Sequence, residues 1–387
     1  MKPTWNPLPE RIRSELMPAP FHMLFALERI KVMKVMKVMK VMKGDLMRAH
    51  SSASFSWRLH LLFLLLTAGC LLVCVCAGSV AIPLADTLDV FRHALLGDVQ
   101  VSSYASILLS IRLPRVLCVA LVGASLSLCG CAMQGLLRNP LADGSTLGVS
   151  AGASLGAVLS LAFGFSIPGL GSGTMAAAMV FAFLSLLLIL SLAYLLDRSL
   201  ETTGIILIGV IFSMFASSLM SLVITFAGDR IRSITFWTMG SLSGATYTQA
   251  LTLLCALVIA GIILILNAEE LNAFSVSEEN ALHIGVPVRR VKLVVLVTVS
   301  MLIGVCVSIG GSISFVGLVV PHMLRLLLGP NHHRLLPASL YGGAIFLMLS
   351  DLLGRILLSP RELPIGVITS LVGAVVFVLI FYRSRKG

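Results

Sequence analysis

Long apolar stretches, each followed by a short polar turn, fill the chain from residue 59 to residue 382. The stretches run about twenty residues each, the length that a helix needs to cross the roughly 30 Å hydrocarbon core of a bilayer. Strands of a transmembrane β-barrel would alternate between apolar and polar residues, and these stretches do not. We therefore predict ten transmembrane helices, near residues 59–82, 113–133, 145–163, 174–196, 204–226, 249–267, 290–308, 312–328, 335–353 and 364–382.

The seventh and eighth predicted spans are separated only by small residues, namely Ser308, Gly310, Gly311 and Ser312. These two spans can therefore also be read as one broken helix. An even number of spans places both chain termini on the same side of the membrane.

Composition agrees with this pattern. Of the 387 residues, 58% are hydrophobic and 12% are charged, and the mean hydropathy is +1.02. So little polar surface could not cover a soluble globule of this size. The predicted fold class is all-α, a polytopic integral membrane protein.

The basic residues are distributed unevenly between the two sides of the predicted membrane. With the N-terminus in the cytoplasm, 21 of the 28 lysines and arginines lie on the cytoplasmic side, 11 of them in residues 1–58. Cytoplasmic loops keep such an excess, so both termini are predicted to be cytoplasmic. The net charge of +11 then reflects contact with membrane lipid, and it gives no reason to expect a nucleic-acid partner.

Residues 1–57 form a basic extension before the first span. Within it, residues 31–43 repeat Lys-Val-Met with a period of three, which drifts around a 3.6-residue helix and gives no stable apolar face. The repeat is either a cationic segment for anionic lipid or a slipped codon repeat upstream of a start at Met47. We expect disorder in residues 1–57, a membrane domain at 58–383 and a short cytoplasmic tail at 384–387.

Three outer connections carry polar residues, at 83–112, 164–173 and 227–248, and one inner connection, 268–292, is long enough for structure of its own. In the inner connection, Ser275-Val-Ser-Glu278 fits a capping box. A short helix is predicted to follow through His283, with Gly285 and Pro287 ending it. Such a helix at the cytoplasmic face is suited to docking a partner protein.

The eight cysteines lie inside predicted spans and are interpreted as small apolar packing residues. The Cys-x-Cys pairs cannot chelate a metal from one helix, since positions i and i+2 point about 200° apart. No metal site is predicted from the sequence. The cysteines are Cys70, Cys74, Cys76, Cys118, Cys129, Cys131, Cys255 and Cys306.

Small residues at a spacing of four, Gly148, Gly152 and Gly156, mark the third predicted span. Such a stripe lets two transmembrane helices approach closely, so these glycines are predicted to serve helix packing.

The chain lacks the means to hydrolyse ATP. Lys292 is the only lysine between Gly44 and the C-terminal tail, and Val-Arg-Arg precedes it, so no phosphate-binding Gly-x-x-x-x-Gly-Lys loop exists. Coupling to an ion gradient would need acidic residues within the spans. Asp351 stands near the end of the ninth span, where an i,i+4 ion pair with Arg355 would satisfy it.

Several motifs together resemble the permease subunit of bacterial ABC importers for iron–siderophore complexes, haem and cobalamin, the FecCD type. The resemblance covers residues 59–382 and rests on many motifs in the family's order. They are Arg112-Leu-Pro-Arg115, Gly130, Gln134-Gly135, Arg138-Asn-Pro-Leu-Ala142, Leu147-Gly148, Gly152, Phe236-Trp-Thr-Met-Gly240, Ala281-x-x-x-Gly285-Val286, Phe315-Val-Gly317, Pro321-His322, Asp351-x-x-x-Arg355 and Glu362-Leu-Pro-Ile-Gly366.

The resemblance implies an assembly in the bacterial inner membrane. A homodimer of ten-helix subunits would bind two ATP-binding-cassette ATPases on the cytoplasmic side and a substrate-binding protein on the outer side. This chain would bind no cofactor, and ATP and magnesium would belong to the ATPases. Iron–siderophore is the first substrate expected, with haem and cobalamin as alternatives that the sequence does not separate.

The resemblance also implies roles for particular residues. Arg112, Arg115 and Arg355 would dock the binding protein. Residues 268–288 would couple to the ATPase, and two further pairs would narrow the cytoplasmic mouth. The coupling residues are Glu278, Glu279, Ala281, Gly285 and Val286, and the mouth residues are Thr202, Thr203, Asn139 and Leu141.

Two other classes of function stay open at this point. An ion-coupled secondary carrier would depend on Asp351 and would not need an ATPase. A membrane assembly factor that transports nothing would leave uptake unchanged when it is deleted.

Overall fold

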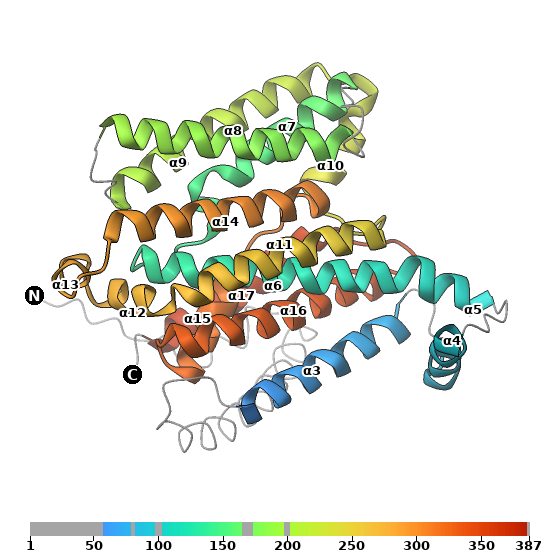
Figure 1. Cartoon of the computed structure of the whole chain (residues 1–387). Coiled ribbons are helices and arrows are strands. Elements are labelled where there is room, and N and C mark those ends of the chain that lie inside the picture. Colours follow the sequence, from blue (N-terminus) through green and yellow to red (C-terminus); the bar gives the residue numbers. More distant parts are fainter. Residues whose placement is uncertain (1–56, 79–81, 97–102, 165–172, 197–201, 385–387) are drawn as a thin grey trace, which may run out of the picture. The chain divides into compact units, whose positions relative to one another are not determined.

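The computed structural model describes residues 57–78, 82–96, 103–164, 173–196 and 202–384, and these residues form helices without any strand (Figure 1). The predictions for the extension 1–57, apart from Trp57, for its Lys-Val-Met repeat and for residues 385–387 lie outside this description.

Each predicted span corresponds to one helix. Within the described residues, seven helices are long and apolar enough to cross a membrane, and three shorter apolar helices match the remaining predictions. The ten are α3 (Trp57–Cys76), α6 (Leu113–Leu136), α7 (Val149–Phe163), α8 (Gly173–Leu196), α9 (Thr202–Thr225), α11 (Tyr247–Leu266), α14 (Val288–Gly310), α15 (Val316–Leu328), α16 (His332–Ile356) and α17 (Ile365–Ser384).

The seventh and eighth spans are two separate helices, α14 and α15. Residues 311–315 join them, and Gly311 and Phe315 both have positive φ, at 71° and 70°. Two left-handed residues within five positions turn the chain out of the helical path, so the broken-helix alternative is not what forms.

Short helices occupy the connections that the sequence indicated only as polar. The segment 83–112 holds α4 (Leu84–Leu96), α5 (Ser103–Ser106) and the π-helical turn η1 (Ile107–Arg112), and η2 (Gly144–Leu147) precedes α7. The segment 227–248 holds η3 (Gly228–Arg230) and α10 (Ile231–Thr238). The second apolar helix therefore runs from Tyr104 to Leu136, farther outward than predicted, because Pro114 is tolerated next to η1.

Helix α6 lies at the centre of the packing and contacts α14, α15 and α16. It approaches its neighbours at glycine pairs, Gly123 with Gly343 of α16 and Gly130 with Gly317 of α15. A Cβ added to Gly123 or Gly130 would overlap the carbonyl oxygen of its partner. Dispersion between closely packed backbones holds helices together in a membrane, where lipid tails are as apolar as leucine.

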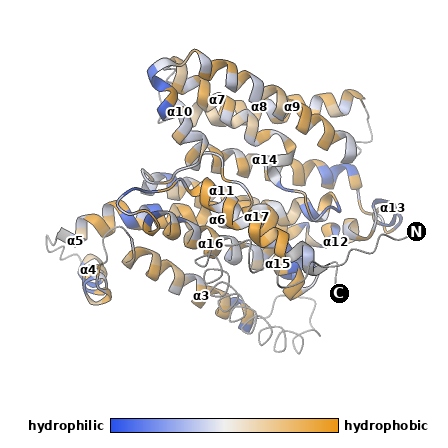
Figure 2. Cartoon of the chain, turned by 180° about the vertical axis from the view of Figure 1, so that it is seen from behind, coloured by the Kyte–Doolittle hydropathy of each residue, from blue (hydrophilic) through white to orange (hydrophobic). Residues whose placement is uncertain are grey.

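The helices α12 (Ala268–Val276) and α13 (Glu278–His283) lie at one end of the helical bundle, and α4, α5 and α10 lie at the other (Figure 1). We call these the α13 end and the α10 end. Hydrophilic residues gather toward both ends, while the middle of the helices is hydrophobic (Figure 2). This is the polarity expected of a bundle whose middle lies in the bilayer.

Candidate functional site: coupling segment and buried charge cluster

The inner connection folds into the short helix predicted for it. Helix α13 ends at His283, as expected, and Gly285 follows with a φ of +88°. The amide of Val286 donates to the carbonyl of Ala281 at 2.9 Å, which closes the helix end. We call residues 268–288 the coupling segment.

The helix cap differs from the prediction. Ser277 caps α13, and its hydroxyl accepts from the amide of Asn280 at 2.9 Å. Ser275, the expected cap, lies within α12 and donates to the carbonyl of Leu271. The reason is that α12 extends through Val276, so Ser277 is the first serine free to cap the next helix.

An ion pair fastens α13 to the start of α14. The Nζ atom of Lys292 lies 2.6 Å from Oε1 of Glu278, and the lysine side chain is 1% exposed while the glutamate side chain is 31% exposed. A buried ammonium is stable only with a paired and hydrogen-bonded carboxylate. Glu278 therefore has a partner within this chain.

Other residues of the coupling segment face outward. Glu279 is exposed, and Val276, Leu282 and Ile284 are large apolar side chains that are 70%, 57% and 70% exposed. Ala281 is fully buried. Exposed apolar residues rimmed by charge are typical of a protein-binding surface.

Helix α12 anchors the coupling segment to the rest of the protein. It packs against α6 and α16 and buries Leu271 and Phe274. The side chain of Asn272 accepts from the amide of His332 at 2.8 Å and donates to Oδ1 of Asn331 at 3.1 Å. A displacement of this segment would therefore reach the helices that pack at the centre.

The three arginines predicted at the outer rim lie at the α10 end, but their side chains are buried. Arg112 donates to the carbonyls of Val75 and Cys76, both at 2.9 Å. Arg355 donates to the carbonyls of Cys74 at 2.9 Å and Ala77 at 3.2 Å. The two guanidinium groups thus satisfy the last carbonyls of α3, where a cation is also favoured by the helix dipole.

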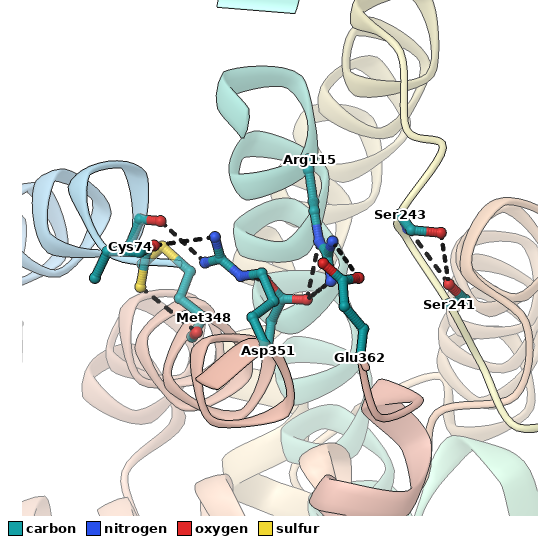
Figure 3. Close-up of polar contacts among 9 residues, drawn as sticks. Cys74, Arg115, Ser241, Ser243, Met348, Asp351 and Glu362 are labelled. Carbon is teal, nitrogen blue, oxygen red and sulfur yellow. Dashed lines mark hydrogen bonds and ion pairs between the residues drawn. The ribbon is translucent and has the colours of Figure 1, made fainter. Parts of the chain in front are cut away.

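Arg115 belongs to a charge cluster with Asp351, Arg355 and Glu362. Its Nη2 atom lies 2.9 Å from Asp351 Oδ1 and its Nη1 atom 2.8 Å from Glu362 Oε2 (Figure 3). Arg355 forms the predicted i,i+4 ion pair with Asp351 at 3.0 Å. Two arginines hold one carboxylate that is 3% exposed, which is the arrangement of a structural ion pair. The docking role of Arg112, Arg115 and Arg355 stays a prediction, since all three have partners within the chain.

The sequence analysis overlooked the arginines that the α10 end does expose. These are Arg92 on α4, Arg230 and Arg232 at η3 and α10, and Arg361 after α16. These arginines fall in polar connections, whereas Arg112, Arg115 and Arg355 lie at the edges of apolar stretches. An arginine surrounded by polar residues in the sequence is more often exposed, and this signal could have identified them.

The residues predicted to narrow the cytoplasmic mouth lie at the start of α9 and in the turn after α6. Thr202 begins α9, the side chain of Thr203 is exposed, and Asn139 accepts from the amide of Leu141 at 2.9 Å in the turn after α6. The gating role of these residues stays a prediction.

The glycines of the small-residue stripe face other helices. Gly148 precedes α7 with a φ of +81°. A Cβ on Gly156 would come within 2.5 Å of the carbonyl oxygen of Ala177 in α8, and one on Gly152 would overlap Ser185 of the same helix.

A hollow of about 350 Å³, with both hydroxyl-bearing and apolar residues in its lining, lies between α10, the link from α14 to α15, and α17. The hydroxyls of Thr238, Ser312, Ser314 and Ser370 line it together with Met239 and Leu371. It offers hydrogen bonds to a polar guest without presenting a charged group.

Comparison with known proteins gives a consistent match. The sequence pattern of the FecCD transport family matches residues 61–383. The uncharacterized ABC transporter permease protein YvrB of Bacillus subtilis is 43% identical over 81% of this chain and 90% of its own length. The hemin transport system permease protein HmuU of Yersinia pestis is 38% identical over 72% and 84%.

A further relative and a solved structure extend the comparison. The vitamin B12 import system permease protein BtuC of Vibrio vulnificus is 35% identical over 76% of this chain and 90% of its own length. A solved metal-chelate type ABC transporter in an inward-facing conformation superimposes with a TM-score of 0.74 and is 30% identical, covering 85% of this chain and all of the other.

Proposed function

The chain belongs to the FecCD transport family, and from this premise we propose that it is the permease of an ABC importer that carries a metal chelate, with iron–siderophore as the first substrate to test. Relatives of similar identity are described as permeases for hemin and for vitamin B12. Both alternatives therefore stay in the test. In this proposal the binding protein provides most of the discrimination among them.

The proposal rests on the exposed apolar surface around α13. Three exposed apolar residues form a contact surface for an ATPase subunit: Val276 at the end of α12, Leu282 in α13 and Ile284 directly after α13. The chain itself has no phosphate-binding loop, so ATP and magnesium are held by that partner. The assembly contains two copies of this chain, two ATPases and one binding protein, with the α13 end and both termini in the cytoplasm and the protein in the bacterial inner membrane.

Motion at the ATPases would reach the transport pathway by two routes. Helix α13 is tied to α14 by the ion pair between Glu278 and Lys292, and α12 packs on α6 and α16. Closure of the ATPases would push α13 and shift these helices as units, because packed helices move between discrete arrangements. The hydroxyl-lined hollow near Ser312 and Ser370 would meet the substrate and bind it weakly.

A binding experiment tests the contact on which this proposal rests. The partner ATPase should co-purify with the unaltered permease and should be lost from the Ile284→Asp variant, since a carboxylate would be buried in the contact without a partner. The control is Ile259→Asp, which makes the same substitution at an apolar side chain on α11 that is 61% exposed, against 70% for Ile284, away from the α13 end. Retention of the ATPase by Ile284→Asp would contradict the docking role of α13.

A further inference from the structure

A second hollow, of about 430 Å³, lies between α3, α6, α11 and α16. Its lining is almost wholly apolar, and Thr67 and Tyr341 are the residues in it that carry hydroxyls. It shares no lining residue with the hydroxyl-lined hollow described above. We call it the lipid groove for the reasons that follow.

Small residues form the floor of the lipid groove, namely Ala120, Ala124, Gly261 and Ala344. Gly261 is the informative one. A Cβ at Gly261 would meet only Leu128 Cδ2, at 3.9 Å, whereas a Cβ at Gly123 would overlap the backbone of a neighbouring helix. Glycine is therefore not needed at position 261 for close helix packing within this chain, and its effect is to leave space.

The groove opens at the depth of the lipid tails. Its walls are α3 and α11, both long and apolar enough to cross the membrane, and α3 is covered so little that 17% of its apolar window is buried. Ile262 lines the groove and is 56% exposed, and Leu65 on α3 is 61% exposed. The medium around these side chains is hydrocarbon, and an apolar hollow offers water too few hydrogen-bond partners to hold it.

One end of the groove leads to groups suited to a lipid headgroup. Tyr341 lines the groove, and its hydroxyl lies 3.4 Å from Nδ1 of His60 in the first turn of α3. The same turn carries Trp57 and the exposed Arg58, whose guanidinium carbon lies 5.8 Å from the Trp57 ring centre. Tryptophan and tyrosine with a basic residue at the start of a span mark the level of the headgroups.

We propose that the lipid groove binds one acyl chain of an anionic phospholipid from the leaflet at the α13 end, with its phosphate beside Arg58. The shape and depth of the hollow select the hydrocarbon chain, and the arginine selects the negative charge of the headgroup. A lipid held there would bridge the loosely packed α3 to α6, α11 and α16. This proposal rests on membrane insertion alone and does not depend on the transported substrate.

The test uses the full-length permease in vesicles that contain phosphatidylglycerol with a photoreactive group at the middle of one acyl chain. After irradiation, labelled peptides are mapped by mass spectrometry, and excess unlabelled phosphatidylglycerol is added as competitor. Labelling of Tyr341 and of residues 257–265 that face the groove should be saturable. At Ile259, which is 61% exposed and does not line the groove, it should not be saturable.

Three variants refine the test. Gly261→Leu fills the groove and should abolish the saturable labelling. Cys255→Leu also introduces a larger apolar side chain, at an exposed position of the same helix outside the groove, and should leave the labelling unchanged. Arg58→Gln should remove the preference for phosphatidylglycerol over phosphatidylethanolamine while labelling continues.

Equal, non-saturable labelling of the groove and of Ile259 in the unaltered protein would overturn the proposal, and so would retained saturable labelling in Gly261→Leu. Absence of labelling in the groove of the unaltered protein, as expected if residues 1–56 or a second copy of the chain filled it in place of lipid, would also overturn the proposal. The competition experiment needs only the unaltered protein, so it remains decisive if a variant fails to fold.

Discussion

The ion pair between Glu278 and Lys292 allows the sharpest perturbation of the coupling segment. The substitution Glu278→Gln keeps the shape of the side chain and removes its charge. The ammonium of Lys292, in a side chain that is 1% exposed, would then stay buried after losing the carboxylate of Glu278. Removing one partner of a fully buried pair costs roughly 3–5 kcal/mol, and because Glu278 is 31% exposed and water can reach the site, we expect about 2–3 kcal/mol.

The opposite substitution should cost less. Lys292→Met keeps most of the apolar stem and leaves a carboxylate that is already 31% exposed and can be hydrated, so we expect a loss of about 1 kcal/mol. The double variant carries neither charge. It should be more stable than Glu278→Gln alone, because it no longer contains a buried ammonium that has lost the carboxylate of Glu278.

The assay is equilibrium unfolding of the purified permease in mixed micelles, with Glu279→Gln as the matched control. Glu279 is exposed and adjacent in sequence, so its substitution should change the free energy of unfolding by about 0.5 kcal/mol or less. In the reconstituted importer, Glu278→Gln should also lower the amount of substrate moved per ATP. Equal costs for the two single variants, adding in the double variant to within about 0.5 kcal/mol, would refute the reasoning.

Three further predictions concern other parts of the molecule. Asp351→Asn removes the carboxylate shared by two buried arginines, of which Arg115 keeps Glu362, and should cost about 3–5 kcal/mol by the same unfolding assay. This is well above the cost expected for Glu362→Gln, whose side chain is 37% exposed, and similar losses in the two variants would contradict this account. Arg232→Glu changes an exposed arginine and should weaken capture of the binding protein in a pull-down without changing the folded yield. Arg355→Glu changes a buried arginine and should reduce the folded yield. The reverse pattern would assign the docking role to Arg355. Deleting residues 1–46 should leave insertion and uptake unchanged, and a loss of either would show that the Lys-Val-Met repeat contributes.

Hydropathy located every apolar helix of the described chain, and the capping-box pattern with Gly285 and Pro287 predicted the short helix ending at His283. Both signals are local. An apolar run of about twenty residues, or a capping serine and a terminating glycine, is recognised from neighbouring residues in the sequence. Because the capping signal is local, it predicted Ser275 as the helix cap, whereas Ser277 is the residue that caps α13. The helix α12 begins earlier and is stabilised by packing on α6 and α16, which no local pattern reports.

Arg115 and Arg355 show more clearly what the sequence alone does not predict. From sequence, Arg115 and Arg355 stand at the edges of apolar spans, where exposed and buried guanidinium groups look the same. Burial is decided by partners distant in the chain, since Arg115 meets Asp351 and Glu362 from 236 and 247 positions away. The i,i+4 pair of Asp351 with Arg355 was predictable because both residues lie on one helix.

The central claim is that this chain forms the pathway of an ATP-driven importer. The direct measurement is uptake by proteoliposomes that contain the permease, its partner ATPase and its binding protein, supplied with labelled ferric siderophore, haem or cobalamin. The account predicts uptake of a ferric siderophore that requires ATP on the side of the ATPase. Uptake driven by an ion gradient without ATP would contradict the account, while ATP-dependent uptake of haem or cobalamin alone would contradict only the choice of substrate.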